Sequence, residues 1–114
     1  YSSIGKEIGL ALNVHIKVRY DYPDNLIEEL LIEAALMTNG ISPKPHPYIF
    51  QLSLGEVNAL YELNAYTFHP ENMYFIKSDL TKNIQSTFRQ ANVEIFSMQY
   101  VELVERKDKN IKKA

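Results

Sequence analysis

The order of the patterned segments constrains the fold of this chain more than any single motif does. Residues 10–20 alternate between apolar and polar side chains, which predicts a strand with one buried face and one solvated face. Residues 48–54 and 57–67 alternate in the same way, and the connection between them is long enough only for an antiparallel hairpin. Residues 93–96 predict a short fourth strand.

Two segments with helical periodicity separate these strands. Residues 21–40 and residues 69–92 place apolar side chains three and four positions apart, which is the spacing of one helix face. A proline suits the first turn of each helix, and Gly40 and Asn92 suit the left-handed residue that ends it. The apolar positions are Leu26, Ile27, Leu30, Leu31, Ala34, Ala35 and Met37 in the first helix and Met73, Ile76, Leu80, Ile84, Phe88 and Ala91 in the second.

The resulting order is β-α-β-β-α-β, and its two halves resemble each other. The first helix opens with the sequence YPDN and the second with HPEN. Two right-handed split β-α-β units interleaved in one sheet predict a ferredoxin-like α+β sandwich, with both helices on one face of a four-stranded antiparallel sheet. The open face is expected to carry His15, Lys17, Arg19, Glu62, Asn64 and Tyr66.

Composition excludes several functional classes. The chain has 114 residues, which predicts one domain, and its formal net charge of -2 gives no overall attraction to nucleic acid or anionic membranes. It has no cysteine, which excludes disulfides, thiolate metal sites and thiol catalysis. No apolar run approaches the roughly 18 residues of a membrane span, and no signal peptide is recognisable.

No side chains have the spacing of a catalytic or metal site. The histidines are spread over different predicted segments: His15, His46 and His69. Three glutamates of the first helix have no partner nucleophile and are expected on its solvated face: Glu28, Glu29 and Glu33. We therefore predict no enzyme activity, no catalytic residue, no cofactor and no metal ion.

A proline-rich segment surrounds His46 and has two possible roles, a ligand loop or a connector. Pro43, Pro45 and Pro47 hold the segment extended and disfavour helix at the residue before each of them. We therefore interpret it as a stiff connector that delivers the chain across the sheet.

A longer ordered pattern resembles a known family. The sequence RYDYPDNLIEELLIEAAL is followed by the proline-rich link, by LSLGEVNALYELNAYT, and after the second helix by ANVEI. This pattern, from about Val14 to Ile95, resembles the C-terminal cytoplasmic domain of the small-conductance mechanosensitive channel (MscS) family. The start of the chain at Tyr1 also looks like the end of the β domain that precedes it in that family, so residues 1–9 are expected to be a linker.

The resemblance implies a function for the whole protein. Members of the family are homoheptamers in the cell (inner) membrane, and a hollow cytoplasmic cage hangs below the pore and releases solutes under tension. The chain would supply part of that cage on the cytoplasmic side, and its only link to the membrane would be pore helices upstream of Tyr1. No nucleic-acid partner is implied.

The sequence after the fourth strand predicts a further strand over residues 98–106, between a domain at 10–97 and a charged tail at 107–114. The four-stranded fold has no slot for it, and a closed ring of identical strands would leave no unpaired edge. We therefore predict an oligomer interface at Tyr100, Val101, Leu103 and Glu105. A flexible tail is the alternative, because the prolines that the family has near Phe96 are absent.

Two other functions share this fold order. An RNA-recognition domain needs aromatic residues on the open face and a basic surround, and its signature is missing. A ferredoxin-like regulatory domain that binds a small molecule would favour glycine at the strand–helix turns, where this chain has Tyr22-Pro23 and His69-Pro70. The regulatory domain is kept as the alternative to the channel cage.

Overall fold

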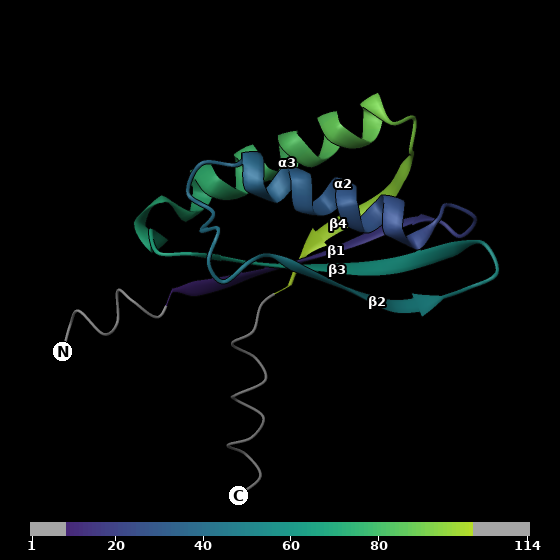
Figure 1. Cartoon of the computed structure of the whole chain (residues 1–114), viewed down its shortest axis with the longest axis horizontal. Helices are drawn as coiled ribbons and strands as arrows, with labels where there is room; N and C mark the ends of the chain where they lie inside the picture. The colour runs from purple at the N-terminus through teal and green to yellow at the C-terminus, as the bar shows by residue number, and fades with distance from the viewer. Residues whose placement is uncertain (1–8, 102–114) are drawn as a thin grey trace, which may run out of the picture.

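The computed structural model describes residues 9–101, which form one four-stranded sheet and two α-helices (Figure 1). The strand order is β2-β3-β1-β4, every pairing is antiparallel, and both helices cover the same face. The ferredoxin-like α+β sandwich is confirmed. In chain order the elements are β1 (Leu10–Arg19), α2 (Asp24–Met37), β2 (Tyr48–Leu54), β3 (Asn58–Thr67), the 3-10 turn η1 (Pro70–Asn72), α3 (Met73–Gln90) and β4 (Ile95–Tyr100).

β1 and β3 form the centre of the sheet. Their register sets apolar residues opposite one another, with Val14 across from Leu63 and Ile16 across from Tyr61. These four side chains are between 0% and 2% exposed. Burying one large apolar side chain stabilises the fold by about 1.5–3 kcal/mol, so this strand pair is the main source of apolar burial in the sheet.

The two helices lie side by side on this apolar face, and α2 lies against β2 and β3. Each helix buries one stripe and leaves its other side exposed, as the 3.6-residue period requires. In α3, Phe88 is 1% exposed, whereas Phe75 is 72% exposed. The buried residues are Ile27, Leu30, Leu31, Ala34 and Ala35 in α2 and Ile76, Leu80, Ile84, Thr87 and Phe88 in α3.

Both predicted left-handed positions after the helices are confirmed. Gly40 has φ +99°, and a Cβ atom there would lie 2.6 Å from Cγ1 of Ile76, so the close approach of α3 also requires glycine. Asn92 has φ +61°, which asparagine tolerates better than most residues. Pro23 differs slightly from the prediction, because it is the extended residue immediately before α2 rather than the first helical residue.

The proline-rich segment connects α2 to β2, the role predicted for it. It is fastened to β3 by the Ser42 amide, which donates to the Tyr66 carbonyl at 2.7 Å. Pro47 is buried, and His46 Nδ1 donates to its carbonyl at 2.8 Å. His46 therefore bonds to its own connector.

Within residues 9–101, the C-terminal end of the sheet is formed by the single strand β4. β4 runs through the predicted boundary after Ser97, and Met98, Gln99 and Tyr100 pair with Ile16, His15 and Val14 of β1. The physical reason is that β1 is long enough to pair with all of them once Phe96 is accommodated as an extra residue between the pairs Lys17–Ser97 and Val18–Ile95. The first residues of the predicted C-terminal strand thus continue the fourth strand, and residues 102–106 lie outside the described part.

Truncation of a buried side chain on α3 tests the assignment of the core. Phe88→Ala should lower the free energy of unfolding by about 3–5 kcal/mol, because it removes a buried ring and leaves a cavity. Phe75→Ala on the exposed side of the same helix is the matched control and should stay within about 0.5 kcal/mol of the parent. Urea unfolding followed by circular dichroism measures both, and equal losses would contradict this core.

Candidate interaction surface

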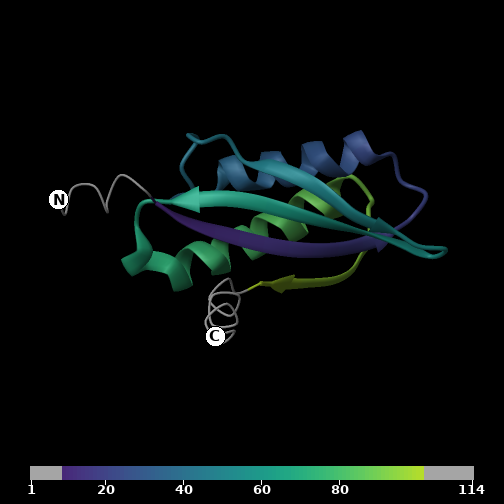
Figure 2. The same cartoon turned by 90° about the horizontal axis from the view of Figure 1, so that it is seen from below.

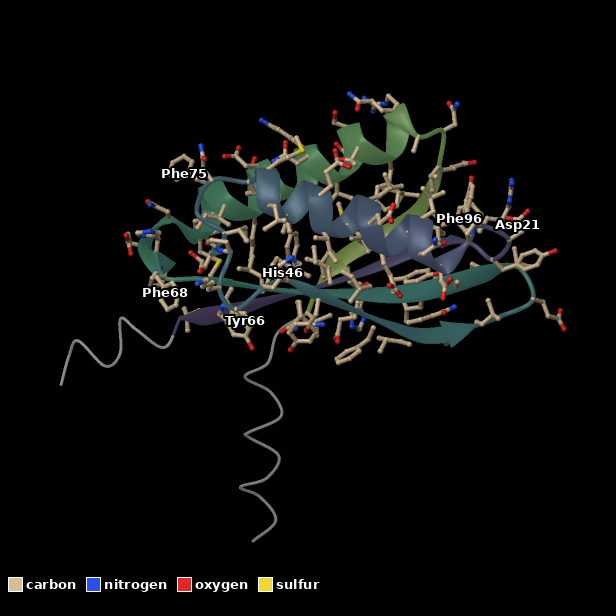
Figure 3. All side chains as sticks on the ribbon, in the orientation of Figure 1. Asp21, His46, Tyr66, Phe68, Phe75 and Phe96 are labelled. Carbon is tan, nitrogen blue, oxygen red and sulfur yellow. The ribbon has the colours of Figure 1, made fainter. Side chains whose placement is uncertain are left out.

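The face of the sheet opposite the helices is the candidate functional surface. The register brings together here the residues predicted for the open face, since His15 lies across from Glu62 and Asn13 lies across from Asn64. Tyr66 projects below the sheet on this side, away from the helices (Figure 3). Successive side chains of a strand point to opposite faces of the sheet. Because the apolar side chains of β1 and β3 are buried in the core, the polar side chains between them must lie on this face.

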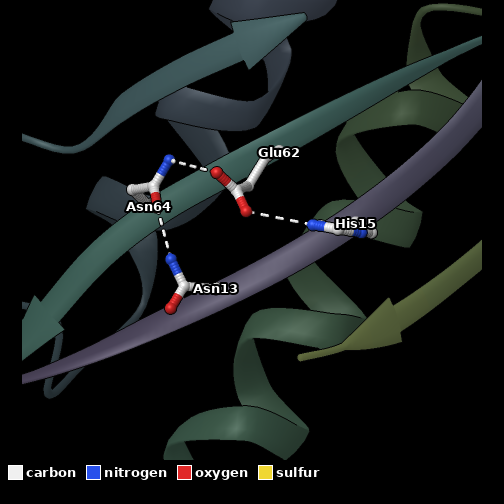
Figure 4. Close-up of polar contacts among 4 residues, drawn as sticks. All are labelled: Asn13, His15, Glu62 and Asn64. Carbon is white, nitrogen blue, oxygen red and sulfur yellow. Dashed lines mark hydrogen bonds and ion pairs between the residues drawn. The ribbon is translucent and has the colours of Figure 1, made fainter. Parts of the chain in front are cut away.

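Four polar side chains in the middle of this face form a connected cluster (Figure 4). His15 Nε2 lies 3.0 Å from Glu62 Oε2, with the two side chains 25% and 20% exposed. Asn64 Nδ2 donates to Glu62 Oε1 at 3.4 Å, and Asn13 Nδ2 donates to Asn64 Oδ1. These contacts join β1 to β3 on the side away from the core, and each donor or acceptor that loses its partner would be left partly desolvated.

One oxygen of the cluster makes no hydrogen bond within residues 9–101. It is the buried Oδ1 of Asn13. Asn64, which accepts a hydrogen bond from the Nδ2 group of Asn13, is only 5% exposed. Buried polar atoms are usually paired, so this unpaired oxygen lowers the stability of the fold. The other hydrogen bonds of the cluster offset that loss.

Aromatic residues of β2 border the polar cluster. Tyr48 and Phe50 lie across from Asn64 and Glu62 and therefore on the same face. Their rings pack edge to face with centroids 5.3 Å apart. The neighbouring Tyr66 hydroxyl, together with partial burial and the charge of Glu62, raises the pKa of Tyr48. The surface thus combines a polar centre with an aromatic border, and aromatic side chains are enriched in protein contact surfaces.

The structure leaves the other candidate residues apart. His15 belongs to the polar cluster, His46 to the connector, and His69 lies 3.6 Å from Glu71 at an exposed site before α3. No group of three histidine, aspartate or glutamate side chains within residues 9–101 could hold a metal ion. The arrangement offers hydrogen bonding in the polar cluster and apolar contact beside it.

The surface of the described residues has several depressions that are open to solvent. One of about 460 Å³ lies on α2 between Glu29, Ile32, Glu33, Leu36 and Met37 and is almost wholly apolar. Another of about 430 Å³ lies where α3 ends, beside Phe88 and Val93. A third depression, of about 390 Å³, gathers the polar side chains of His69, Asn72 and Asp79 before and within α3. Small-molecule sites are usually enclosed apolar cavities with a few well-placed polar groups, whereas these three depressions are open.

Tyr100, one of the four predicted interface residues, is bonded within its own domain. Its hydroxyl lies 2.9 Å from Thr81 Oγ1 and donates to the Lys77 carbonyl at 2.9 Å. Burial raises the pKa of Tyr100, because the ionised phenolate would be poorly solvated there. The Lys77 ammonium lies 5.2 Å from the centre of its ring. The hydrogen bonds of the hydroxyl and the contact of the ring with the Lys77 ammonium hold Tyr100 against α3.

The other predicted interface residues lie at or beyond the end of the described part. The Val101 amide donates to the Asn13 carbonyl at 2.9 Å, which continues the pairing with β1. Leu103 and Glu105 lie outside the described residues. An interface at these positions stays a prediction.

The sequence analysis did not identify Asn13, Tyr48 and Phe50 as parts of this surface. Asn13 shares the polar alternation of His15, but nothing in the sequence says that it lies across from another asparagine. The alternation of β2 places Tyr48 and Phe50 on one face without saying which face. The register of the strands decides both the asparagine pairing and the face that the two aromatic side chains occupy. A shift of one residue would move these side chains to the other face of the sheet.

Paired replacement of the two asparagines tests the coupling within the cluster. Asn64→Val should cost about 1–3 kcal/mol, because the Asn13 amide loses its acceptor while it remains partly buried. The double replacement Asn13→Val with Asn64→Val should recover part of that loss, since no polar group is then stranded and valine suits strands. Urea unfolding of the two single variants and the double variant measures the coupling. Additive losses would contradict it.

The comparison with known families agrees with the fold. Within residues 9–101, none of the helices is both long and apolar enough to cross a membrane. No curated protein matches the chain. The family described as "Mechanosensitive ion channel MscS, C-terminal" matches residues 12–95, which run from β1 to the first residue of β4. This is a family of ion channels rather than enzymes, and its C-terminal domain points to the cytoplasmic part of such a channel. The chain therefore belongs to the MscS family of mechanosensitive ion channels, as its C-terminal domain.

Proposed function

We propose that this chain forms part of the cytoplasmic cage of a membrane channel that opens under tension and releases solutes during hypo-osmotic shock. The single observation that carries the proposal is the family match over residues 12–95. The ferredoxin-like fold supports it weakly, because that fold hosts many unrelated functions. In this proposal the membrane helices belong to another part of the protein, and the domain has no catalytic role.

The chemistry of the open face supports a role in assembly and in shaping a vestibule. Its polar cluster is bonded across two strands, and its aromatic border is exposed, with Phe50 53% accessible. Channels of this family are oligomeric, and we propose a homoheptamer in the inner membrane with this domain on the cytoplasmic side. A ring of identical domains encloses a space between them without any change in fold.

The C-terminal segment has a proposed role in the same assembly. A strand that follows the described residues would need a partner of its own, because an unpaired strand edge is a liability. We place that partner in the neighbouring subunit, with Val101, Leu103 and Glu105 at the contact.

Recording of current from the full-length protein that carries this chain tests the channel function. In membrane patches, suction should evoke current that is absent at zero applied tension. Phe88→Ala should reduce the number of channels by destabilising the domain, whereas Phe75→Ala should match the parent. A correctly inserted protein that gives no tension-dependent current would show that the proposed function is wrong.

Two truncations of the full-length protein test the C-terminal contact. Truncation after Arg106 removes only the charged tail and should leave the assembly mass unchanged. Truncation after Val101 keeps all of β4 but removes the segment with Leu103 and Glu105, and it should lower the assembly mass or the temperature at which the assembly dissociates. Native mass spectrometry in detergent compares the two. Identical behaviour of both truncated proteins would assign assembly to other surfaces.

A further inference from the structure

The two edge strands of the sheet carry no charge, although the strands between them do. β2 reads YIFQLSL and β4 reads IFSMQY, without aspartate, glutamate, lysine or arginine. The central strands carry Lys17, Arg19 and Glu62. Proteins that keep a sheet edge free usually place charged residues or proline on it, because an uncharged edge associates with other chains. In this sheet the charged residues lie on the central strands, and the two edge strands lack them.

The β2 edge also carries exposed apolar side chains on both faces of the sheet. Phe50 is 53% exposed and Leu54 is 64% exposed. The Tyr20 amide donates to the Val57 carbonyl at 3.1 Å, which places Tyr20 beside the hairpin that joins β2 to β3. Exposed apolar groups gathered in one place mark contact sites. We name as the β2 surface the six residues Tyr20, Tyr48, Phe50, Leu52, Leu54 and Val57, each at least 40% exposed.

Each edge strand contains an irregularity at a large apolar residue. In β2, Leu52 has no partner between the pairs Gln51–Tyr61 and Ser53–Leu60. In β4, Phe96 has no partner between the pairs with Ser97 and Ile95. Both residues are exposed, at 45% and 42%. Bulges interrupt the backbone ladder that an added strand would need, so contact at these edges is by side-chain packing rather than by continuation of the sheet.

The two edges lie on opposite sides of the molecule, as the view of the open face shows (Figure 2). Three strand spacings of about 4.8 Å separate them, so they are about 14 Å apart and cannot touch within one domain. A partner for the β2 surface has to present an uncharged edge with exposed apolar area, and within the described residues β4 of a second copy offers one with the ring of Phe96 exposed. Contacts between two different surfaces of identical subunits run head to tail and can close into a ring.

We infer that the β2 surface of one subunit packs against the β4 edge of the next, with Leu52 and Phe96 at the centre of the contact. This inference rests on the proposed function, because it assigns a surface to the assembly that the channel requires. The occupant is a second copy of this chain.

Cysteine cross-linking in the full-length protein tests the contact. The chain has no cysteine of its own, so Leu52→Cys and Phe96→Cys introduce defined thiols at exposed sites. A disulfide needs Cα atoms within about 7 Å, which the strand separation prevents inside one domain. Under mild oxidation the double variant should give a ladder of covalent oligomers on a non-reducing gel, and each single variant should remain at background.

Matched controls separate this contact from random collision and from misfolding. Leu52→Cys combined with Phe75→Cys pairs the same edge with a more exposed site on the outer side of the helical layer and should give no ladder (Figure 3). Leu52→Lys alone and Phe96→Glu alone should weaken the assembly, and their combination should restore it, because opposite charges then face each other across the contact. Restoration excludes general unfolding of the variants.

The outcomes distinguish the inference from the proposed function. An assembled channel that conducts under tension but gives no Leu52–Phe96 cross-link would leave the function intact and overturn this contact. A dimer formed by Leu52→Cys alone would indicate a symmetric contact and would also overturn it. A protein that never assembles would overturn both.

Discussion

The antiparallel pairing of β1 with β3 is the interaction on which the rest of the structure depends. It joins two strands of 10 residues each that are distant in sequence, and it closes the apolar face on which both helices lie. The hydrogen-bonded ladder satisfies the backbone of both strands, while burial of Val14, Ile16 and Leu63 supplies the apolar free energy. Once this pair is formed, β2 and β4 can only take the two outer positions.

The same pairing creates the surface of functional interest. A residue that faces away from the core on β1 meets a residue that faces away from the core on β3, and this brings His15 to Glu62 and Asn13 to Asn64. The polar cluster therefore follows from the register of the core. The neutral edges follow from the topology in a similar way, because the strands that carry charge occupy the middle of the sheet. Charge thus gathers at the centre of the open face and apolar area at its borders.

Membership in the channel family and the fold carry different information. A ferredoxin-like sandwich is compatible with RNA binding, ligand binding and assembly, so the fold by itself selects none of them. The family match selects among them, and the surface chemistry agrees with assembly, since aromatic side chains border a bonded polar centre. The regulatory-domain alternative finds little support in the described residues, where the depressions are open rather than enclosed.

The sequence by itself determined the type and order of the elements and the residues that end the helices. A period of two or of 3.6 residues is a local property, and the left-handed conformations of Gly40 and Asn92 depend on residues close in sequence. Only the tertiary structure decided that Phe96 bulges from β4, that the strand continues to Tyr100, and that Tyr48 and Phe50 share a face with Glu62. The physical reason is that the alternation of apolar and polar residues in one strand does not specify its partner strand. The register is set by the core side chains that meet across the sheet. Tyr100 shows this most clearly, since its strand pattern is visible in the sequence but its bonds to Thr81 and Lys77 exist only because α3 lies over that end of β4.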